Sequence, residues 1–107
     1  MRHNRLRKYL LSGDIDLKHN SYFDGNVQSL GINTNEGYAT VGVIAPGKYT
    51  FGTEKQEKMV ITVGSLQVRI AGEPDKTVSA GSHFIVDAGT SFEVECAADV
   101  SYICYYR

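Results

Sequence analysis

Most of this chain consists of short runs in which β-branched and aromatic residues alternate with polar ones, separated by Gly, Asn and Asp. Leu66, Val68 and Ile70, for example, alternate with Gln67 and Arg69, so a strand formed there has one apolar face. A helical period of 3.6 is not sustained after residue 22. The pattern predicts strands over residues 39–44, 47–51, 58–63, 65–70, 82–86, 91–96 and 100–106.

The connections between these runs are short and contain residues that favour turns, as in Pro46-Gly47 and Ala88-Gly89. Strands that have one apolar face and short connections pair in antiparallel sheets. The sequence therefore predicts an all-β, antiparallel domain of the sandwich or barrel type rather than a βαβ fold.

The length and the charge distribution limit what such a domain does. A chain of 107 residues has room for one domain. The first ten residues carry four positive charges and no acidic residue, which leaves seven basic and twelve acidic residues, a net charge of −5, for positions 11–107. This acidic body argues against a nucleic-acid partner. No apolar run approaches the ~20 residues that span a bilayer, so we expect no membrane partner.

Residues 1–19 are predicted to form an N-terminal extension before the β domain. Residues 3–11 of it form either a short basic helix or a frayed tail. The apolar stretch at residues 9–11 is shorter than the ~7–15 residues of a secretory signal core, so we expect a cytoplasmic protein. Cys96 and Cys104 lack the number and spacing of a disulfide framework or a zinc site, which predicts free thiols.

The spacing of glycines resembles the two sequence motifs of the cupin superfamily. Gly47, Glu57 and Gly64 fit the first motif, and Gly81 and Gly89 fit the second. This resemblance implies a single-domain, cupin-like jelly-roll β-barrel over residues 20–107.

Cupins commonly bind a metal ion through histidines of these motifs, and this chain lacks them. The three histidine positions hold Thr53, Lys55 and Phe92, so only Glu57 of the ligand set is present. A transition-metal site needs several converging His, Cys or carboxylate ligands. We therefore expect neither a metal nor another cofactor.

A narrower resemblance joins six segments in order along the chain. They are NSYFDGNVQS (20–29), ATVGV (39–43), GKYTFGT (47–53), EKM (57–59), GSL (64–66) and SYICYY (101–106). Together they resemble the small pyrimidine/purine nucleoside phosphorylase family. The resemblance implies a cytoplasmic homodimer that cleaves purine and pyrimidine nucleosides with inorganic phosphate, giving free base and α-D-ribose 1-phosphate. Asp87 and Ser91 depart from the family pattern in a loop that is expected to influence specificity.

The cupin register predicts that Tyr49, Phe51, Thr53 and Lys55 share one strand face that looks into the barrel. On this hypothesis Thr53 binds phosphate or ribose, Lys55 neutralises phosphate, and Glu57 holds ribose hydroxyls or offsets positive charge at C1′. The alternative is that Tyr49 and Phe51 are core, Lys55 and Glu57 form a solvated turn pair, and Thr53 ends a strand. Polar groups at barrel-facing positions need partners, which keeps the binding hypothesis open.

Phe92 and Tyr102 are the candidates on the opposite wall, as platforms on which a base stacks, or else as ordinary core. Cys104 lies among Ile and Tyr, where a thiol is usually a small buried hydrophobe rather than a nucleophile. Arg69 and Arg107 are alternative phosphate ligands, although Arg69 alternates with core positions and should face solvent.

Three functions follow from these features. The leading hypothesis is a broad-specificity nucleoside phosphorylase with nucleosides and phosphate as its substrates. A non-catalytic, metal-free cupin that binds a small molecule is the alternative, because missing metal ligands and an acidic body suit it equally. Metal-dependent chemistry is the third, and it predicts metal retained through purification.

Overall fold

The computed structural model describes residues 17–107, and these residues form ten strands and no helix. The strands are β1 (His19–Tyr22), β2 (Val27–Thr34), β3 (Gly37–Ile44), β4 (Gly47–Gly52), β5 (Glu57–Val63), β6 (Ser65–Ile70), β7 (Lys76–Ser79), β8 (His83–Val86), β9 (Ser91–Cys96) and β10 (Val100–Tyr106). Nothing in this range could therefore cross a membrane as a helix.

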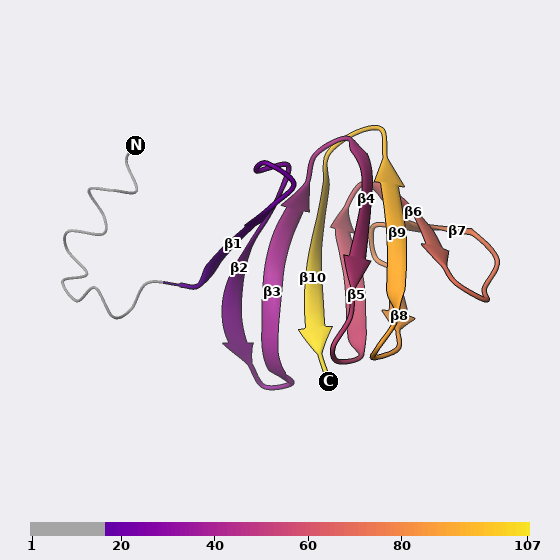
Figure 1. The fold of residues 1–107 in the computed structure, drawn as a ribbon. Coiled ribbons are helices and arrows are strands. Elements are labelled where there is room, and N and C mark those ends of the chain that lie inside the picture. Colours follow the sequence, from indigo (N-terminus) through magenta and orange to yellow (C-terminus); the bar gives the residue numbers. More distant parts are fainter. Residues whose placement is uncertain (1–16) are drawn as a thin grey trace.

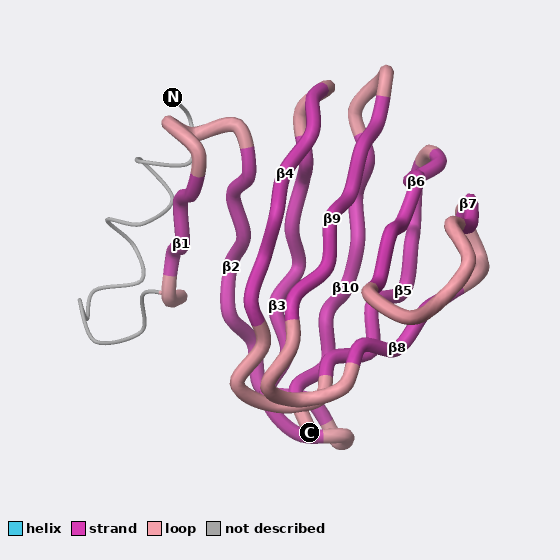
Figure 2. The backbone as a smooth tube through the Cα atoms, turned by 45° about the vertical axis from the view of Figure 1, so that its right-hand side comes forward, coloured by secondary structure: helices cyan, strands magenta, loops and turns pink. Residues whose placement is uncertain are grey.

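The strands form two antiparallel sheets that face each other (Figures 1 and 2). The six-stranded sheet has the order β1-β2-β3-β10-β5-β8, and the four-stranded sheet has the order β4-β9-β6-β7. The last strand, β10, lies between β3 and β5, so the C-terminal segment closes the middle of the larger sheet (Figure 1). This arrangement confirms the all-β, antiparallel, cupin-like prediction.

All seven predicted strands are present, with ends within two residues of the expected ones. The strands β1, β2 and β7 were not predicted. In β2 the buried positions include Ser29 and Gly31, while Leu30 is exposed. The strand therefore lacks the alternation of apolar and polar residues from which the other strands were predicted. A Cβ at residue 31 would collide with the ring and hydroxyl of Tyr38, which explains the glycine.

The short strands β1 and β7 lie at sheet edges, and β1 buries no residue fully. His19 was expected before the barrel, but it is the first residue of β1, where its ring Nε2 lies 3.0 Å from Gln28 Oε1. His83 is exposed. The predicted helix over residues 3–11 lies outside the described residues, as does all of the expected extension except residues 17–19.

The core fills the space between the sheets and has contributions from both. Ile44, Ile61, Val68 and Val94 are among its fully buried members. Each comes from a position that alternation along its strand directs inward. Both cysteines are free and buried.

Candidate active site

A cavity of about 490 Å³ lies between the two sheets, within the ~300–1,000 Å³ that small-molecule sites usually have. We call it the aromatic cavity, because six of its lining residues are aromatic. Its lining consists of Tyr22, Phe23, Ser29, Ile44, Thr50, Phe51, Gly52, Glu57, Met59, Phe92, Tyr102, Cys104 and Tyr106.

One wall of the aromatic cavity comes from the adjacent strands β10 and β5. Alternation along β10 directs Tyr102, Cys104 and Tyr106 to the same face. In the antiparallel register Tyr106 is opposite Glu57 and Cys104 is opposite Met59. The pairing therefore places Glu57, the only carboxylate that residues 17–107 contribute to the lining, beside a phenol and a thiol.

The opposite wall comes from β4 and β9 and is aromatic. Phe51 and Phe92 are register partners, and their rings stack with centroids 5.6 Å apart. Phe92 also meets Phe84 of the core, with centroids 5.9 Å apart. Phe92 is 4% exposed, whereas Phe51 is only partly buried, so Phe92 anchors the wall and Phe51 presents it to the cavity.

Polar groups lie along the wall formed by β10 and β5. Cys104 Sγ donates a hydrogen bond to Glu57 Oε1 at 3.5 Å. The hydroxyl of Tyr106 lies 3.1 Å from Thr40 Oγ1 on β3. The first contact restrains the Glu57 carboxylate and the second restrains the Tyr106 side chain, so both are held in place before a substrate binds.

Burial sets the protonation states of this group. It raises the pKa of Glu57, against a smaller opposite effect of the hydrogen bond from Cys104. It also raises the pKa of Tyr102 to about 12, and it raises the pKa of Cys104 and of Tyr106. The phenols and the thiol therefore remain protonated donors at neutral pH, and Cys104 is not activated as a nucleophile.

Four of the seven residues proposed from the sequence line the aromatic cavity together: Phe51, Glu57, Phe92 and Tyr102. Tyr49 is on the same strand as Phe51 but is 7% exposed and belongs to the core. Its hydroxyl lies 2.8 Å from the carbonyl oxygen of Ala45.

The strand face expected to carry Thr53 and Lys55 ends before them, because β4 stops at Gly52. Thr53 is buried, with its Oγ1 2.7 Å from the Asp87 carbonyl oxygen and 3.0 Å from the Thr90 nitrogen, which donates to it. It thus joins two loops rather than facing the aromatic cavity.

Lys55 is exposed and lines a neighbouring depression of about 390 Å³. This depression, which we call the Lys55 hollow, is formed by Tyr38, Gly52, Glu54, Lys55, Glu57 and Tyr106. It shares Gly52, Glu57 and Tyr106 with the aromatic cavity, so these residues separate the two spaces. Lys55 makes no ion pair with residues 17–107.

The sequence reasoning missed five polar or aromatic lining residues: Tyr22, Phe23, Ser29, Thr50 and Tyr106. Tyr106 continues the alternation of Tyr102 along the same strand, and that signal was available. Thr50 lies next to Phe51 on β4. The other three belong to β1, β2 and the turn between them, which were not predicted.

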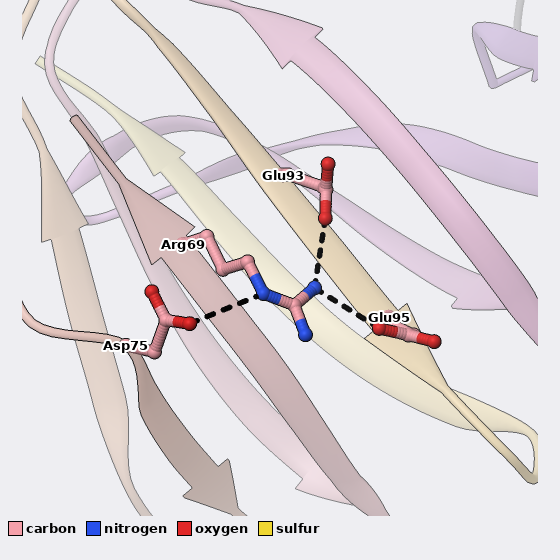
Figure 3. A network of polar contacts seen from close by, with 4 residues as sticks. All are labelled: Arg69, Asp75, Glu93 and Glu95. Carbon is pink, nitrogen blue, oxygen red and sulfur yellow. Dashed lines mark hydrogen bonds and ion pairs between the residues drawn. The ribbon is translucent and has the colours of Figure 1, made fainter.

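The two arginines considered for phosphate are bound to carboxylates elsewhere. Arg69 lies between Asp75, Glu93 and Glu95, at 3.3, 2.7 and 3.0 Å (Figure 3). Arg107 pairs with Glu36 at 3.4 Å. Within the described range, the lining of the aromatic cavity contains no Lys or Arg, and no three His, Cys, Asp or Glu side chains come together as metal ligands.

Gly42 of β3 makes room for the Tyr102 ring, since a Cβ at this position would collide with it. We expect Gly42→Ala to displace the ring and to cost about 1–3 kcal/mol of unfolding free energy. Urea denaturation measures the effect. Gly52→Ala, where a new Cβ has nothing closer than 3.9 Å, should stay within about 0.5 kcal/mol of the wild type. Equal costs for both variants would contradict the close-approach argument.

Comparison with known proteins gives this geometry its context. The family model for pyrimidine/purine nucleoside phosphorylase matches residues 17–106. The chain belongs to the pyrimidine/purine nucleoside phosphorylase family. It is 47% identical over 91 residues to such a phosphorylase of Pseudomonas fluorescens, a match that covers 84% of this chain and 97% of the relative. It is 44% identical to one of Magnetococcus marinus, with 84% and 98% covered.

Solved structures agree with this membership. A Vibrio parahaemolyticus protein of unknown function has a TM-score of 0.81 and 43% identity, covering 86% of this chain and 99% of that one. An RmlC-like cupin from Shewanella frigidimarina has a TM-score of 0.66 and 17% identity, covering 87% and 84%, and it supports the cupin fold alone. The fold of this phosphorylase family member is therefore cupin-like.

Proposed function

We propose that this protein cleaves purine and pyrimidine nucleosides with inorganic phosphate in the aromatic cavity, releasing the free base and α-D-ribose 1-phosphate. The observation that carries the proposal is a single carboxylate among six aromatic rings, next to a hollow with a lysine, in a member of the phosphorylase family. The reaction needs a place for the base, stabilisation of positive charge at C1′, and a place for phosphate on the opposite side.

The aromatic wall suits the base. Every nucleobase has a π-face, so stacking on Phe51 and Phe92 accepts purines and pyrimidines alike. The hydroxyls of Tyr102 and Tyr106 are protonated donors at neutral pH, as phenols ordinarily are, and burial raises their pKa values further. They are suited to hydrogen-bond to the ring nitrogen or exocyclic oxygen on which charge develops as the base leaves.

Glu57 suits the ribose. Its carboxylate accepts ribose hydroxyls and offsets the positive charge that develops at C1′ as the glycosidic bond weakens. Partial burial strengthens this interaction, because charges attract more strongly where water is excluded. The hydrogen bond from Cys104 holds one carboxylate oxygen and leaves the other for substrate.

The Lys55 hollow suits phosphate. It shares Glu57 and Tyr106 with the aromatic cavity. We infer that a phosphate bound there approaches C1′ from the face opposite the base. The C1′–N bond breaks with its electron pair passing to the base, and an oxygen of hydrogen phosphate forms the C1′–O bond from the opposite face. The proton of the hydrogen phosphate passes to the base, which balances the reaction. Because phosphate attacks from the opposite face, the configuration at C1′ is inverted.

Lys55 gives the hollow its only cation among residues 17–107. We expect Lys55→Ala to raise the KM for phosphate about tenfold, with little change in the KM for nucleoside, as measured by initial rates with either substrate varied. Glu54→Gln removes a negative charge from the same hollow and should shift the phosphate KM in the opposite direction. Equal changes in both KM values, or a Lys48→Ala control that matches Lys55→Ala, would contradict this assignment.

The experiment that tests the proposed function is incubation of the purified protein with uridine, adenosine or guanosine, with and without phosphate. We expect base release that depends on phosphate, together with α-D-ribose 1-phosphate in the phosphorus NMR spectrum. Release without phosphate would indicate hydrolysis. Nucleoside binding without any product would instead support the non-catalytic binding module, which the same cavity could serve.

We further propose that the protein acts as a homodimer in the cytoplasm. The outer face of the six-stranded sheet exposes Leu30, Val41 and Val43, of which Leu30 and Val41 are register partners. A second copy that packs on this apolar face would cover it. Two reduced, buried cysteines suit a reducing compartment. Light scattering of the wild type and of Val43→Lys measures the association.

A further inference from the structure

The turn between β1 and β2 has an unusual backbone. The N–H of Gly25 donates to the carbonyl oxygen of Tyr22 at 3.1 Å, which closes a four-residue turn. Its two central residues, Phe23 and Asp24, have φ values of 53° and 56°, the signature of a type I′ turn. The carbonyl oxygen of Phe23 accepts from both the backbone N–H and the side-chain Nδ2 of Asn26, each at 3.1 Å, so the turn is held in one conformation.

The residues at the centre of this turn do not suit it. A type I′ turn favours Asn followed by Gly, because both residues adopt the left-handed region with little steric cost. A bulky aromatic residue in this region is a rare exception. Phe23 therefore destabilises the turn locally. The strained backbone conformation determines where the Phe23 ring lies.

That ring lies against the aromatic cavity. Its centroid is 5.0 Å from that of Tyr49 and 5.4 Å from that of Phe51, with an interplanar angle of 89° to Phe51. Neighbouring residues of a regular strand point to opposite faces, yet Tyr22 and Phe23 both line the cavity. Phe23 remains 42% exposed, so much of the ring has no protein neighbour.

We propose that Phe23 is a substrate-binding residue, whose ring the left-handed turn holds beside Phe51 at the cavity so that it contacts the nucleobase. This inference rests on the proposed function for the identity of the ligand. An aromatic ring in this position accepts purines and pyrimidines alike, because every base has a π-face. It extends the aromatic wall with a side chain from the turn between β1 and β2.

The proposal predicts opposite effects of one substitution on the turn and on binding. Phe23→Asn supplies the residue that the turn favours and removes the ring. We expect the KM or Kd for adenosine to rise about tenfold, in keeping with the loss of one stacked ring. Relief of strain offsets the lost ring packing, so the Tm should stay within about 4 °C of the wild type. A residue with only a structural role would not weaken binding without loss of stability.

Asp24→Gly is the matched control, because it relieves the same turn and keeps the Phe23 ring. It should raise the Tm slightly and leave the KM for adenosine unchanged. Phe23→Tyr restores a ring at the position and should bind adenosine as the wild type does.

A direct readout of contact is available because the chain has no tryptophan. Phe23→Trp places the only indole of the protein at the cavity, and titration with adenosine, without phosphate, should change its emission in a saturable way. Phe23→Asn kinetics like those of the wild type, or an indole that does not respond to saturating adenosine, would overturn the proposal. A Phe23→Asn variant that no longer self-associates but binds adenosine as the wild type does would overturn it too. If the wild type releases no base but the indole still responds, the proposed phosphorolysis fails and the binding role of residue 23 stands.

Discussion

Replacing Glu57 with Gln is expected to lower kcat for nucleoside phosphorolysis by about 10²–10³-fold while the protein stays folded. Gln keeps the shape of the side chain and can still accept a hydrogen bond from Cys104, but it cannot offset the positive charge that develops at C1′. The loss should therefore appear mainly in kcat rather than in the KM for nucleoside. Initial rates at saturating uridine and phosphate measure it.

The pH profile gives an independent check of the role of Glu57. Because burial raises its pKa, the carboxylate is lost at a higher pH than an exposed Glu would lose it. Wild-type activity should fall as the pH decreases through that raised pKa, and this limb should be absent from the residual activity of Glu57→Gln. A limb that persists in the variant would assign it to another group.

The contribution of Glu57 to stability should depend on pH in the opposite sense to its contribution to activity. A carboxyl whose pKa is raised on folding stabilises the protein at low pH, and this contribution is lost as the pH rises through the folded pKa. Glu57→Gln removes that loss, so its free energy of unfolding at pH 7 should be equal to or higher than that of the wild type.

Glu73→Gln, on an exposed carboxylate that pairs with Lys76, is the control for the kinetic role of Glu57 and should keep normal kcat. A Glu57→Gln enzyme with more than a third of wild-type kcat would contradict the assigned role.

The largest expected effect on stability is that of Phe92→Ala. The ring is 4% exposed and contacts both Phe84 in the core and Phe51 at the cavity. Its removal leaves a void between the sheets and should cost about 3–5 kcal/mol, a large part of the ~5–15 kcal/mol by which a domain is usually stable. Urea denaturation at 25 °C measures the change.

Two further variants separate the packing role of Phe92 from its role in the cavity wall. Phe92→Leu keeps most of the buried volume, so it should restore much of the stability but not the stacking surface for a base. Val63→Ala, on a side chain that is 62% exposed, should change the free energy of unfolding by less than about 0.5 kcal/mol. A loss below about 1 kcal/mol for Phe92→Ala would show that the two sheets repack without this ring.

The sequence was sufficient to predict the fold where each strand buries alternate apolar residues. Strands β6, β9 and β10 have this pattern and were predicted to the residue. Strand β2 was not, because its inward positions include Ser29 and Gly31 in place of large apolar residues. Gly31 leaves room for the ring of Tyr38 on the neighbouring strand β3, and a glycine of this kind adds nothing to an apolar alternation.

The candidate site was predictable to the extent that it follows strand alternation. Phe51, Glu57, Phe92 and Tyr102 all reach the aromatic cavity, and they were chosen from the cupin motif positions together with strand alternation. The same reasoning failed beyond Gly52, because the end of β4 depends on loop contacts such as that between Thr53 and the Asp87 carbonyl oxygen. Those contacts join positions more than thirty residues apart, which no spacing rule within one strand describes.

The central claim is that phosphorolysis takes place in the aromatic cavity between the two sheets. The most direct test is a crystal structure of the protein with phosphate and a nucleoside analogue whose glycosidic bond cannot be cleaved. We expect the base between the aromatic rings, C1′ beside Glu57, and phosphate in the Lys55 hollow on the opposite face of the ribose. A nucleoside bound instead on the outer face of the six-stranded sheet, with the aromatic cavity empty, would contradict the account.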